Sequence, residues 1–323
     1  MDEKRNRAWP ETEAVQEAGA RFAANVGRVL VGKEEPIRLI FAALLCEGHV
    51  LIEDVPGVGK TILARAAARS LGCTFRRIQC TPDLLPSDIM GLQYFNPKSA
   101  DFEFRPGPIV ANIVVVDEIN RAMPRTQSAL LECMQERQIT VDLATLPLPR
   151  PFLILATQNP IELEGTFPLP EAQLDRFLLK IGLGYPSQAE EGSILARFGR
   201  ENPLETLQPV LEGADLLALQ KICRRVHVEP SVGDYLVALT RATRDHADVQ
   251  LGASPRASLG LHLASQALAA LAGRDYVLPD DVKALAVAVL AHRLTLKPEA
   301  RLRDRTEASV VGDLLATVPV PAE

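Results

Sequence analysis

The feature of this sequence that most restricts its fold is a glycine-rich loop, Pro56-Gly57-Val58-Gly59-Lys60-Thr61. The loop follows an apolar segment at residues 49–52, which predicts a buried strand, and precedes a helical segment at 61–71. Glycines in such a loop let backbone N–H groups turn inward, and the helix N-terminus adds partial positive charge. Lys60 would reach the β and γ phosphates, and Thr61 would bind Mg²⁺. The loop therefore predicts a site for a nucleoside triphosphate.

One position departs from the pattern GxxxxGK[ST] that describes such loops. That pattern has a glycine where this chain has Asp54, so the affinity for polyphosphate could differ from that of a standard loop. The two glycines nearest the lysine, Gly57 and Gly59, are present. The alternative interpretation is a glycine-rich turn that binds no ligand.

Two acidic residues, Asp117 and Glu118, follow a second apolar segment at residues 113–116. In phosphoryl transfer, Asp117 would organise Mg²⁺ through its water shell, and Glu118 would polarise the attacking water as a general base. Acidic residues after a strand are also common as helix caps. Because the pair follows a phosphate-binding loop along the chain, we favour the catalytic interpretation.

Three further polar residues could act on the nucleotide. Asn159 follows the apolar segment 152–156 and could hold the lytic water or sense the γ-phosphate; the alternative is an Asn-Pro turn. Arg176 could neutralise charge on the transferred phosphoryl group across a subunit boundary; the alternative is a surface ion pair with Asp175. Arg256 begins a helix of the second domain and could reach the nucleotide, or it could be a solvated residue at a helix start.

Short aliphatic segments alternate with helical ones in the first half of the chain. This alternation predicts the α/β class, a parallel sheet with helices on both faces. Strands are expected at residues 49–52, 75–79, 113–116, 152–156 and 177–183, and helices at 11–30, 35–45, 61–71 and 126–136. Residues 94–104 and 138–150 interrupt the alternation, and each segment predicts a β-hairpin.

The sequence changes character after Tyr185-Pro186, where Ala- and Leu-rich helical segments follow one another. They predict a small all-helical domain with helices at residues 189–198, 214–226, 231–245, 255–271 and 279–294. We therefore expect an α/β domain at 1–188, a helical domain at 189–300, and a charged, partly mobile tail at 301–323.

Composition disfavours several other classes of protein. The net charge of −6 argues against a dedicated nucleic-acid binder, which usually carries a basic surface. The five cysteines form no CxxC pair and the five histidines have no metal-ligand spacing, so neither a disulfide framework nor a zinc site is expected. Residues 1–7 are charged, and no apolar run reaches the length of a membrane span, which predicts a cytoplasmic protein without a signal peptide.

In this order, the elements resemble those of the AAA+ ATPases, and more closely those of the MoxR family, over about residues 20–295. Five blocks carry the resemblance: EDVPGVGKT at 53–61, QCTPDLLPSD at 79–88, FRPGP at 104–108, DEINRA at 117–122 and FPLPEAQLDRF at 167–177. Asp54 is tolerated within that family. The resemblance implies a P-loop NTPase fold of AAA+ type, an αβα sandwich followed by a helical lid domain. It also implies an insertion at 94–104 within the second helix and a hairpin at 138–150 before sensor 1.

The resemblance further implies roles for individual residues. Asp117 and Glu118 match Walker B, Asn159 sensor 1, Arg176 the arginine finger, and Arg256 sensor 2. Residues 56–61 match the Walker A loop, and Val31 and Gly32 match the segment that lies against the adenine. Together the expected contacts are Val31, Gly32, Pro56, Gly57, Val58, Gly59, Lys60, Thr61, Ile62 and Arg256, with Mg²⁺ held by Thr61 and Asp117.

By the same resemblance, we expect a ring, typically hexameric, that couples ATP turnover to chaperone-like remodelling, maturation or metal insertion of protein clients. Such proteins often act beside a partner with a von Willebrand factor A domain. Two alternatives stay open. One is a DNA-acting motor of the helicase type, with Tyr94, Phe95, Phe102 and Phe104 lining a pore; the acidic balance disfavours it. The other is a nucleotide-dependent binding module with little turnover, which the complete set of catalytic residues disfavours.

Overall fold

The computed structural model describes residues 10–141, 144–160, 165–199 and 202–321. The charged start at residues 1–7, on which the expectation of no signal peptide rests, lies outside them. The chain divides into two compact units, Phe22–Leu216 and Met1–Arg21 together with Leu217–Glu323. This division falls later than the boundary expected at residue 188 and cuts helix α1 (Pro10–Gly27). Among the described residues, no helix is both long and apolar enough to cross a membrane.

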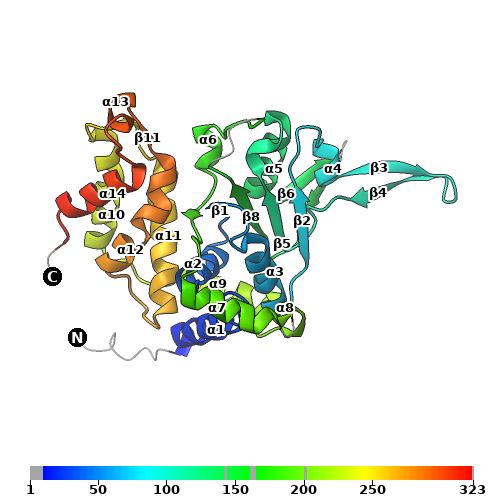
Figure 1. Cartoon of the computed structure of the whole chain (residues 1–323), viewed down its shortest axis with the longest axis horizontal. Helices are drawn as coiled ribbons and strands as arrows, with labels where there is room; N and C mark the ends of the chain where they lie inside the picture. Colours follow the sequence, from blue (N-terminus) through cyan, green and yellow to red (C-terminus); the bar gives the residue numbers. More distant parts are fainter. Residues whose placement is uncertain (1–9, 142–143, 161–164, 200–201, 322–323) are drawn as a thin grey trace. The chain divides into compact units, whose positions relative to one another are not determined.

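The unit of residues 22–216 is built on a five-stranded parallel sheet in the order β2-β5-β8-β1-β9 (Figure 1). The strands are β1 (Val50–Glu53), β2 (Phe75–Gln79), β5 (Ile113–Asp117), β8 (Leu153–Gln158) and β9 (Leu179–Ile181). All five were expected, although β9 is shorter than the aliphatic run that predicted it. Strand β5, which lies between β2 and β8, is buried at every position, as a strand covered on both faces should be. The α/β class is confirmed.

Helices α2 (Glu34–Leu45), α3 (Lys60–Ser70) and α5 (Pro124–Glu136) flank this sheet. Side chains of a strand alternate between faces, so Val114 and Val116 share one hydrophobic cluster with Leu130 and Leu131 of α5. Helix α3 also contacts β5. Each fully buried aliphatic side chain stabilises the fold by roughly 1.5–3 kcal/mol. Shorter helices complete the unit: α4 (Pro86–Met90), η1 (Ile119–Arg121), α6 (Glu171–Leu174), α7 (Gln188–Phe198), α8 (Pro203–Thr206) and the start of α9 (Gly213–Cys223).

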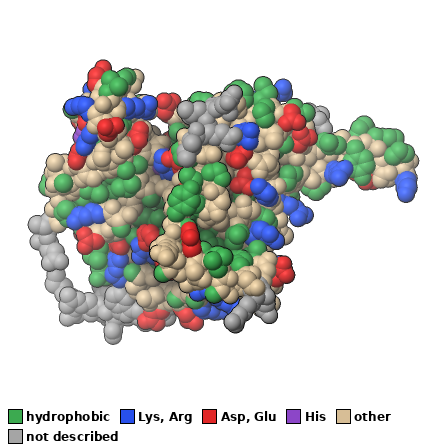
Figure 2. All heavy atoms as spheres, in the orientation of Figure 1, with side chains coloured by type: hydrophobic (Ala, Val, Ile, Leu, Met, Phe, Trp, Pro, Cys, Tyr) green, Lys and Arg blue, Asp and Glu red, His purple; other side chains and the backbone are tan. Residues whose placement is uncertain are grey.

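Both expected hairpins are present. The first pairs β3 (Gly91–Asn96) with β4 (Asp101–Pro106) and extends away from the sheet (Figure 1), and the second pairs β6 (Gln138–Val141) with β7 (Ala144–Pro147). The turn of the second, residues 142–143, lies outside the described residues. Hydrophobic side chains line the projecting β3–β4 hairpin in Figure 2, and Phe95 and Phe102 are 52% and 65% exposed.

The first hairpin does not interrupt a helix, which corrects one expectation. It follows α4, and residues 107–112 then form turns that lead into β5 instead of resuming a helix. Gly107 donates its backbone N–H to Met90 O and lies so close to the backbone of Ile89 that a side chain would not fit. Pro106 and Pro108 on either side lack the N–H that a helix interior requires.

His49, directly before β1, is fully buried in this unit. Its Nδ1 accepts a hydrogen bond from the backbone N–H of Ile154 at 2.9 Å, so Nε2 carries the proton and donates to Met134 O at 3.0 Å. Burial disfavours the charged ring and lowers the pKa of His49 from 6.5 to about 4. The imidazole is therefore a neutral structural link between three segments of the chain.

This link predicts a loss of stability in mild acid. Between pH 6.5 and about pH 4 the unfolded chain binds a proton at His49 that the folded protein does not. The free energy of unfolding should therefore decrease as the pH is lowered through this range. Over that range the expected loss is roughly 3 kcal/mol, and below about pH 4 this contribution should saturate.

Urea denaturation at half-unit pH steps measures the effect. The His49→Gln variant should lack the part of the slope that His49 causes, whereas His227→Gln, at an exposed histidine, should keep the wild-type slope. An unchanged slope in His49→Gln would contradict the assignment.

The other unit contains four helices that pack on one another: α10 (Pro230–Asp245), α11 (Pro255–Leu271), α12 (Pro279–Leu290) and α14 (Glu307–Thr317). Short elements η2 (Ala291–Arg293) and α13 (Pro298–Arg301) connect the last two. The helical lid is confirmed, but it is not purely helical. Strand β10 (Val249–Leu251) pairs antiparallel with β11 (Thr295–Leu296).

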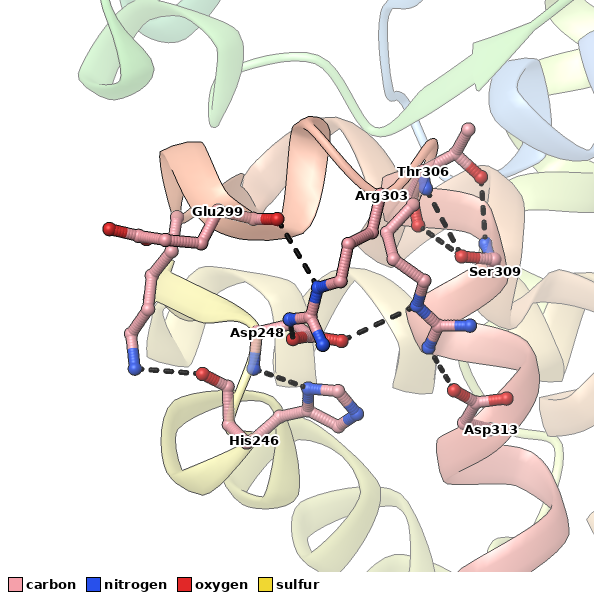
Figure 3. A network of polar contacts seen from close by, with 10 residues as sticks. His246, Asp248, Glu299, Arg303, Thr306, Ser309 and Asp313 are labelled. Atoms are coloured by element: carbon pink, nitrogen blue, oxygen red, sulfur yellow. Dashed lines mark hydrogen bonds and ion pairs between the residues drawn. The ribbon is translucent and has the colours of Figure 1, made fainter.

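The segment expected as a tail from residue 301 is part of this unit. Helix α14 buries Val310, Val311 and Leu314, and Thr306 caps its first turn. Directly before α14, Arg303 Nη2 donates to Asp248 Oδ1 at 2.7 Å, and Arg305 forms an ion pair with the same carboxylate at 3.3 Å (Figure 3). The sequence expectation failed because the acidic partner of these arginines lies more than fifty residues earlier in the chain.

Candidate functional site

The phosphate-binding loop, residues 54–59, connects the end of β1 to the first residue of α3, Lys60. Gly57 and Gly59 have φ angles of +87° and +96°, which residues with a side chain rarely adopt. An added Cβ at either position would meet no atom within 4 Å, so backbone conformation, and not crowding, requires glycine. Gly59 is the N-cap residue of α3, and the free amides of the first turn make this helix end suitable for an anion.

Lys60 folds back onto the loop that precedes it. Its Nζ donates to the backbone oxygens of Asp54 and Val55, at 2.6 and 3.2 Å. Partial burial lowers the pKa of Lys60, while the carboxylates of Asp54, Asp117 and Glu118 act in the opposite direction. The ammonium group therefore lies close to the acidic pair that the sequence analysis singled out.

Asp54 has a structural task that explains its presence in place of glycine. Its Oδ1 accepts from the backbone N–H of Val55 at 2.8 Å, and its Oδ2 accepts from those of Leu183 and Gly184, each at 2.6 Å. Asp54 has no positive φ, so glycine is not required there. The carboxylate ties the start of the phosphate-binding loop to the segment that follows β9. Such hydrogen bonds to a charged group are each worth about 1.5–3 kcal/mol.

Asp117 and Glu118 lie at the carboxyl end of β5, beside the loop. The carboxylate of Asp117 is only 9% exposed, and its Oδ2 accepts from the Thr61 hydroxyl at 3.4 Å. Thr157 joins both acids: its hydroxyl donates to Asp117 Oδ1 at 3.2 Å and accepts from the backbone N–H of Glu118 at 2.9 Å. Glu118 is in the left-handed region, with φ of +56°. The fold thus brings Thr61, Asp117 and Glu118 together.

Besides Thr157, three further residues outside the expected set contact these acids. The guanidinium of Arg77 donates from Nε to Asp117 Oδ2 at 2.6 Å and from Nη2 to Gln79 Oε1 at 2.8 Å. Gln79 Nε2 in turn donates to Glu118 Oε2 at 3.1 Å, and Arg121 Nη1 donates to the same oxygen at 3.1 Å. Both carboxylates therefore have donors from strand β2 or η1.

Asn159 and Arg176 lie at opposite ends of the parallel strands. We call the side of the sheet where the strands end its carboxyl edge and the side where they begin its amino edge. Strand β8 lies between β5 and β1, so Asn159, directly after β8, is at the carboxyl edge with Asp117 and the loop. Arg176 precedes β9, which runs parallel to β1, so it lies at the amino edge. A four-residue strand separates these edges by roughly 10 Å or more. The fold does not bring Arg176 to the loop of its own subunit.

The remaining expected contacts are spread more widely. Val31 and Gly32 lie in the connection between α1 and α2. Gly32 has φ of +70°, and the Glu190 carboxylate of α7 occupies the space where its Cβ would lie. Ile62 is exposed on the first turn of α3. Arg256 lies in the first turn of α11, in the other compact unit, and its contact with the nucleotide stays a prediction.

Comparison with known proteins identifies the family. The family model described as "ATPase family associated with various cellular activities (AAA)" matches residues 49–179, and the "AAA lid domain" matches 241–314. The Bacillus subtilis protein YeaC is 51% identical over 299 residues, which cover 93% of each chain. The chaperone MoxR1 of Mycobacterium tuberculosis is 46% identical over 310 residues, which cover 93% of this chain and 82% of that protein. This chain belongs to the MoxR family of AAA+ ATPases.

A solved structure agrees with the fold. The crystal structure of a protein from Cytophaga hutchinsonii has a TM-score of 0.91 and 37% sequence identity, and the match covers 97% of each chain. Membership of the MoxR family supports ATPase activity, and AAA+ proteins typically form oligomeric rings.

The residues of this MoxR protein fit a magnesium ion. Mg²⁺ prefers hard oxygen ligands and is usually held by one or two protein groups together with phosphate oxygens and water. The Thr61 hydroxyl and the Asp117 carboxylate, 3.4 Å apart, provide such oxygens beside the phosphate-binding loop. Among the described residues, no group of three or more His, Cys, Asp or Glu could hold a metal by itself. Mg²⁺ bound by Thr61 and Asp117 would take its remaining ligands from phosphate oxygens and water.

The contacts from β2 were missed because β2 is an edge strand. Arg77 and Gln79 alternate with buried Ile78, a pattern typical of a strand with one solvated face. The register places Gln79 opposite Asp117, and this pairing was the information that the sequence analysis lacked.

Proposed function

We propose that this MoxR-family protein binds ATP with Mg²⁺ at the phosphate-binding loop and hydrolyses it at the interfaces of a ring, most simply a hexamer. The observation that carries the proposal is the convergence of Lys60, Thr61 and Asp117 at the N-terminus of α3, with Glu118 beside them. The ATP turnover would drive chaperone-like remodelling, maturation or metal insertion of protein clients.

Each residue has a role that follows from its position. The amides of the loop and of the first turn of α3 would bind the phosphates, and Lys60 would exchange its two backbone acceptors for β and γ oxygens. Thr61 and Asp117 would hold Mg²⁺, which would supply charge neutralisation on the phosphates. Glu118 would orient the attacking water and accept its proton, and Asn159, at the same sheet edge, would hold that water or sense the γ-phosphate.

One carboxylate oxygen of Glu118 is already engaged by two side chains of its own subunit. In the structure its Oε2 accepts from both Gln79 and Arg121, which stabilise the carboxylate and orient it toward η1 and β2. We infer that nucleotide binding rearranges these donors.

The position of Arg176 supports a ring. Because it lies at the sheet edge opposite the loop, it could only complete the nucleotide site of a neighbouring subunit. An arginine supplied in this way stabilises the charge of the transition state and is worth roughly 10³–10⁵ in kcat. Arg256 of the lid would contact the nucleotide as well.

Mixing two inactive variants tests the subunit boundary. Arg176→Ala should bind ATP but lose hydrolysis by at least about 100-fold. Glu118→Gln subunits keep Arg176, so mixed rings should regain activity at every Arg176→Ala site that has a Glu118→Gln neighbour. Such sites make up about a quarter of all sites when equal amounts of the two variants assemble into rings at random. The measurement is phosphate release by each variant alone and by the mixture. Activity of the mixture no greater than the sum of its parts would favour a local ion pair with Asp175.

A von Willebrand factor A domain partner and a protein client complete the proposal. Glu118→Gln, which should retain ATP, offers a trap for the client. Co-purification of proteins with this variant, compared with Lys60→Ala as a control that should not bind ATP, tests the chaperone role. ATPase stimulation by DNA that weakens with salt would instead favour a DNA-acting motor.

A further inference from the structure

The buried carboxylate of Asp117 has a cationic partner that the proposed ATPase mechanism does not use. A buried anion is costly unless it is paired and hydrogen-bonded. Asp117, 9% exposed, accepts from two hydroxyl groups, of Thr61 and Thr157, and from the guanidinium of Arg77. Arg77 is the cation that contacts this carboxylate directly, with Nε 2.6 Å from Oδ2, whereas the nearby Lys60 ammonium donates to backbone oxygens of the loop.

Arg77 acts on the oxygen at which Mg²⁺ is expected. Oδ2 is also the oxygen that accepts from the Thr61 hydroxyl, and Thr61 and Asp117 are the two proposed metal ligands. A guanidinium at Oδ2 and a divalent cation near Thr61 and Asp117 would repel each other, and the guanidinium would compete with the metal or its water shell for the lone pairs of Oδ2. The two cations are therefore alternatives at one position.

The strand that carries Arg77 allows it to leave. Its side chain is 53% exposed, because β2 is the edge strand of the sheet, so the guanidinium can move into water without breaking the core. Its second contact, from Nη2 to Gln79 Oε1, is also exposed. Strand β2 itself is held by its parallel register with β5 from Phe75 to Gln79, and that register does not depend on the Arg77 side chain.

We propose that Arg77 is a positioning residue that neutralises Asp117 in the nucleotide-free protein and competes with Mg²⁺ for it. Loading of Mg²⁺ with the nucleotide displaces the guanidinium from Oδ2. Arg77 thereby raises the Mg²⁺ concentration at which the metal is half-bound together with the nucleotide. It also holds the Asp117 carboxylate in position until the metal binds. This inference rests on the proposed function, because it assumes that Thr61 and Asp117 hold the metal.

The size of the effect follows from the exposure of the pair. A half-exposed ion pair is worth up to about 1 kcal/mol, which corresponds to a factor of about 5 in an equilibrium constant. Removal of the Arg77 charge should therefore lower, by about 5-fold, the Mg²⁺ concentration at which the effect of the metal on nucleotide binding is half-maximal. The alternative, that Arg77 supports the metal site, predicts the opposite sign.

The experiment measures binding of a fluorescent ADP analogue to the full-length protein, first in EDTA and then over a Mg²⁺ series. The variants are Arg77→Gln and, as a matched control, Arg76→Gln, which removes the same charge from the neighbouring exposed position of the same strand. In EDTA all three proteins should bind the analogue within about 2-fold of one another. In Mg²⁺, the midpoint should fall about 5-fold in Arg77→Gln and stay unchanged in Arg76→Gln.

The other outcomes separate the hypotheses. An unchanged or raised Mg²⁺ midpoint in Arg77→Gln overturns the inference, and so does an equal fall in Arg76→Gln, which would indicate a general charge effect. If the wild type binds no adenine nucleotide in either condition, the proposed function itself fails. Should Arg77→Gln not fold, Arg77→Lys, which keeps the charge but not the Nε donor, should show a smaller fall, and no fall would overturn the inference.

Discussion

Replacement of Lys60 by alanine should weaken ATP binding by roughly 100-fold or more, equivalent to about 2.7 kcal/mol. Lys60 is the residue of the phosphate-binding loop whose ammonium group can pair with the phosphates, and it lies at the N-terminus of α3. In the structure it donates to two carbonyl groups of its own loop, and the buried Asp117 keeps its direct ion pair with Arg77 when Lys60 is replaced. The measurement is isothermal titration of the purified variant with ATP and Mg²⁺.

A matched variant separates this effect from a general loss of charge. Lys283→Ala removes a lysine that pairs with Asp280 on helix α12, and it should bind ATP as the wild type does. The thermal midpoint of Lys60→Ala should stay close to that of the wild type, because no core contact is lost. Wild-type affinity in Lys60→Ala would remove the basis of the whole nucleotide site.

Replacement of Glu118 by glutamine should lower kcat for ATP hydrolysis by about 10²–10⁴-fold and leave ATP affinity nearly unchanged. Glutamine has the size of glutamate and can still accept from Gln79 and Arg121, so the geometry at the end of β5 should be kept. It cannot accept a proton from the attacking water. Single-turnover hydrolysis, measured together with ATP binding, distinguishes a lost base from a lost site.

Glu132→Gln is the control for this substitution. Glu132 is exposed on helix α5, and its replacement should change neither kcat nor affinity. Turnover of Glu118→Gln within a few-fold of the wild type would show that another group activates the water.

Local sequence sufficed for the elements whose signals lie within a few residues. Strand β2 and helix α11 begin and end where the pattern of apolar residues and the Ser254-Pro255 start predicted. Gly57 and Gly59 were recognised because a glycine-rich loop lies between a predicted strand and a helix start, and both glycines have a positive φ in the structure. The pair Asp117 and Glu118 was recognised because it follows a short aliphatic strand. For these features, chain neighbours supply the physical constraint.

Contacts between distant segments could not be predicted in the same way. Asp54 appeared to be a defect of the phosphate-binding loop until its carboxylate was found on the amides of Leu183 and Gly184. The end of the chain looked like a charged tail because Arg303 and Arg305 pair with Asp248, far away in sequence. Charged residues near the end of a chain resemble a solvated segment whenever their partners are elsewhere.

The sequence by itself determined the α/β class, the phosphate-binding loop and the two acids, because strand periodicity, glycine conformation and helix starts are set by local chain geometry. The tertiary structure decided which groups surround those acids, since Arg77 and Gln79 reach them only through the pairing of β2 with β5. It also decided that Arg176 lies at the far edge of the sheet, because that position depends on the parallel alignment of β9 with β1. Strand register is a cooperative property of the folded sheet, and no single segment encodes it.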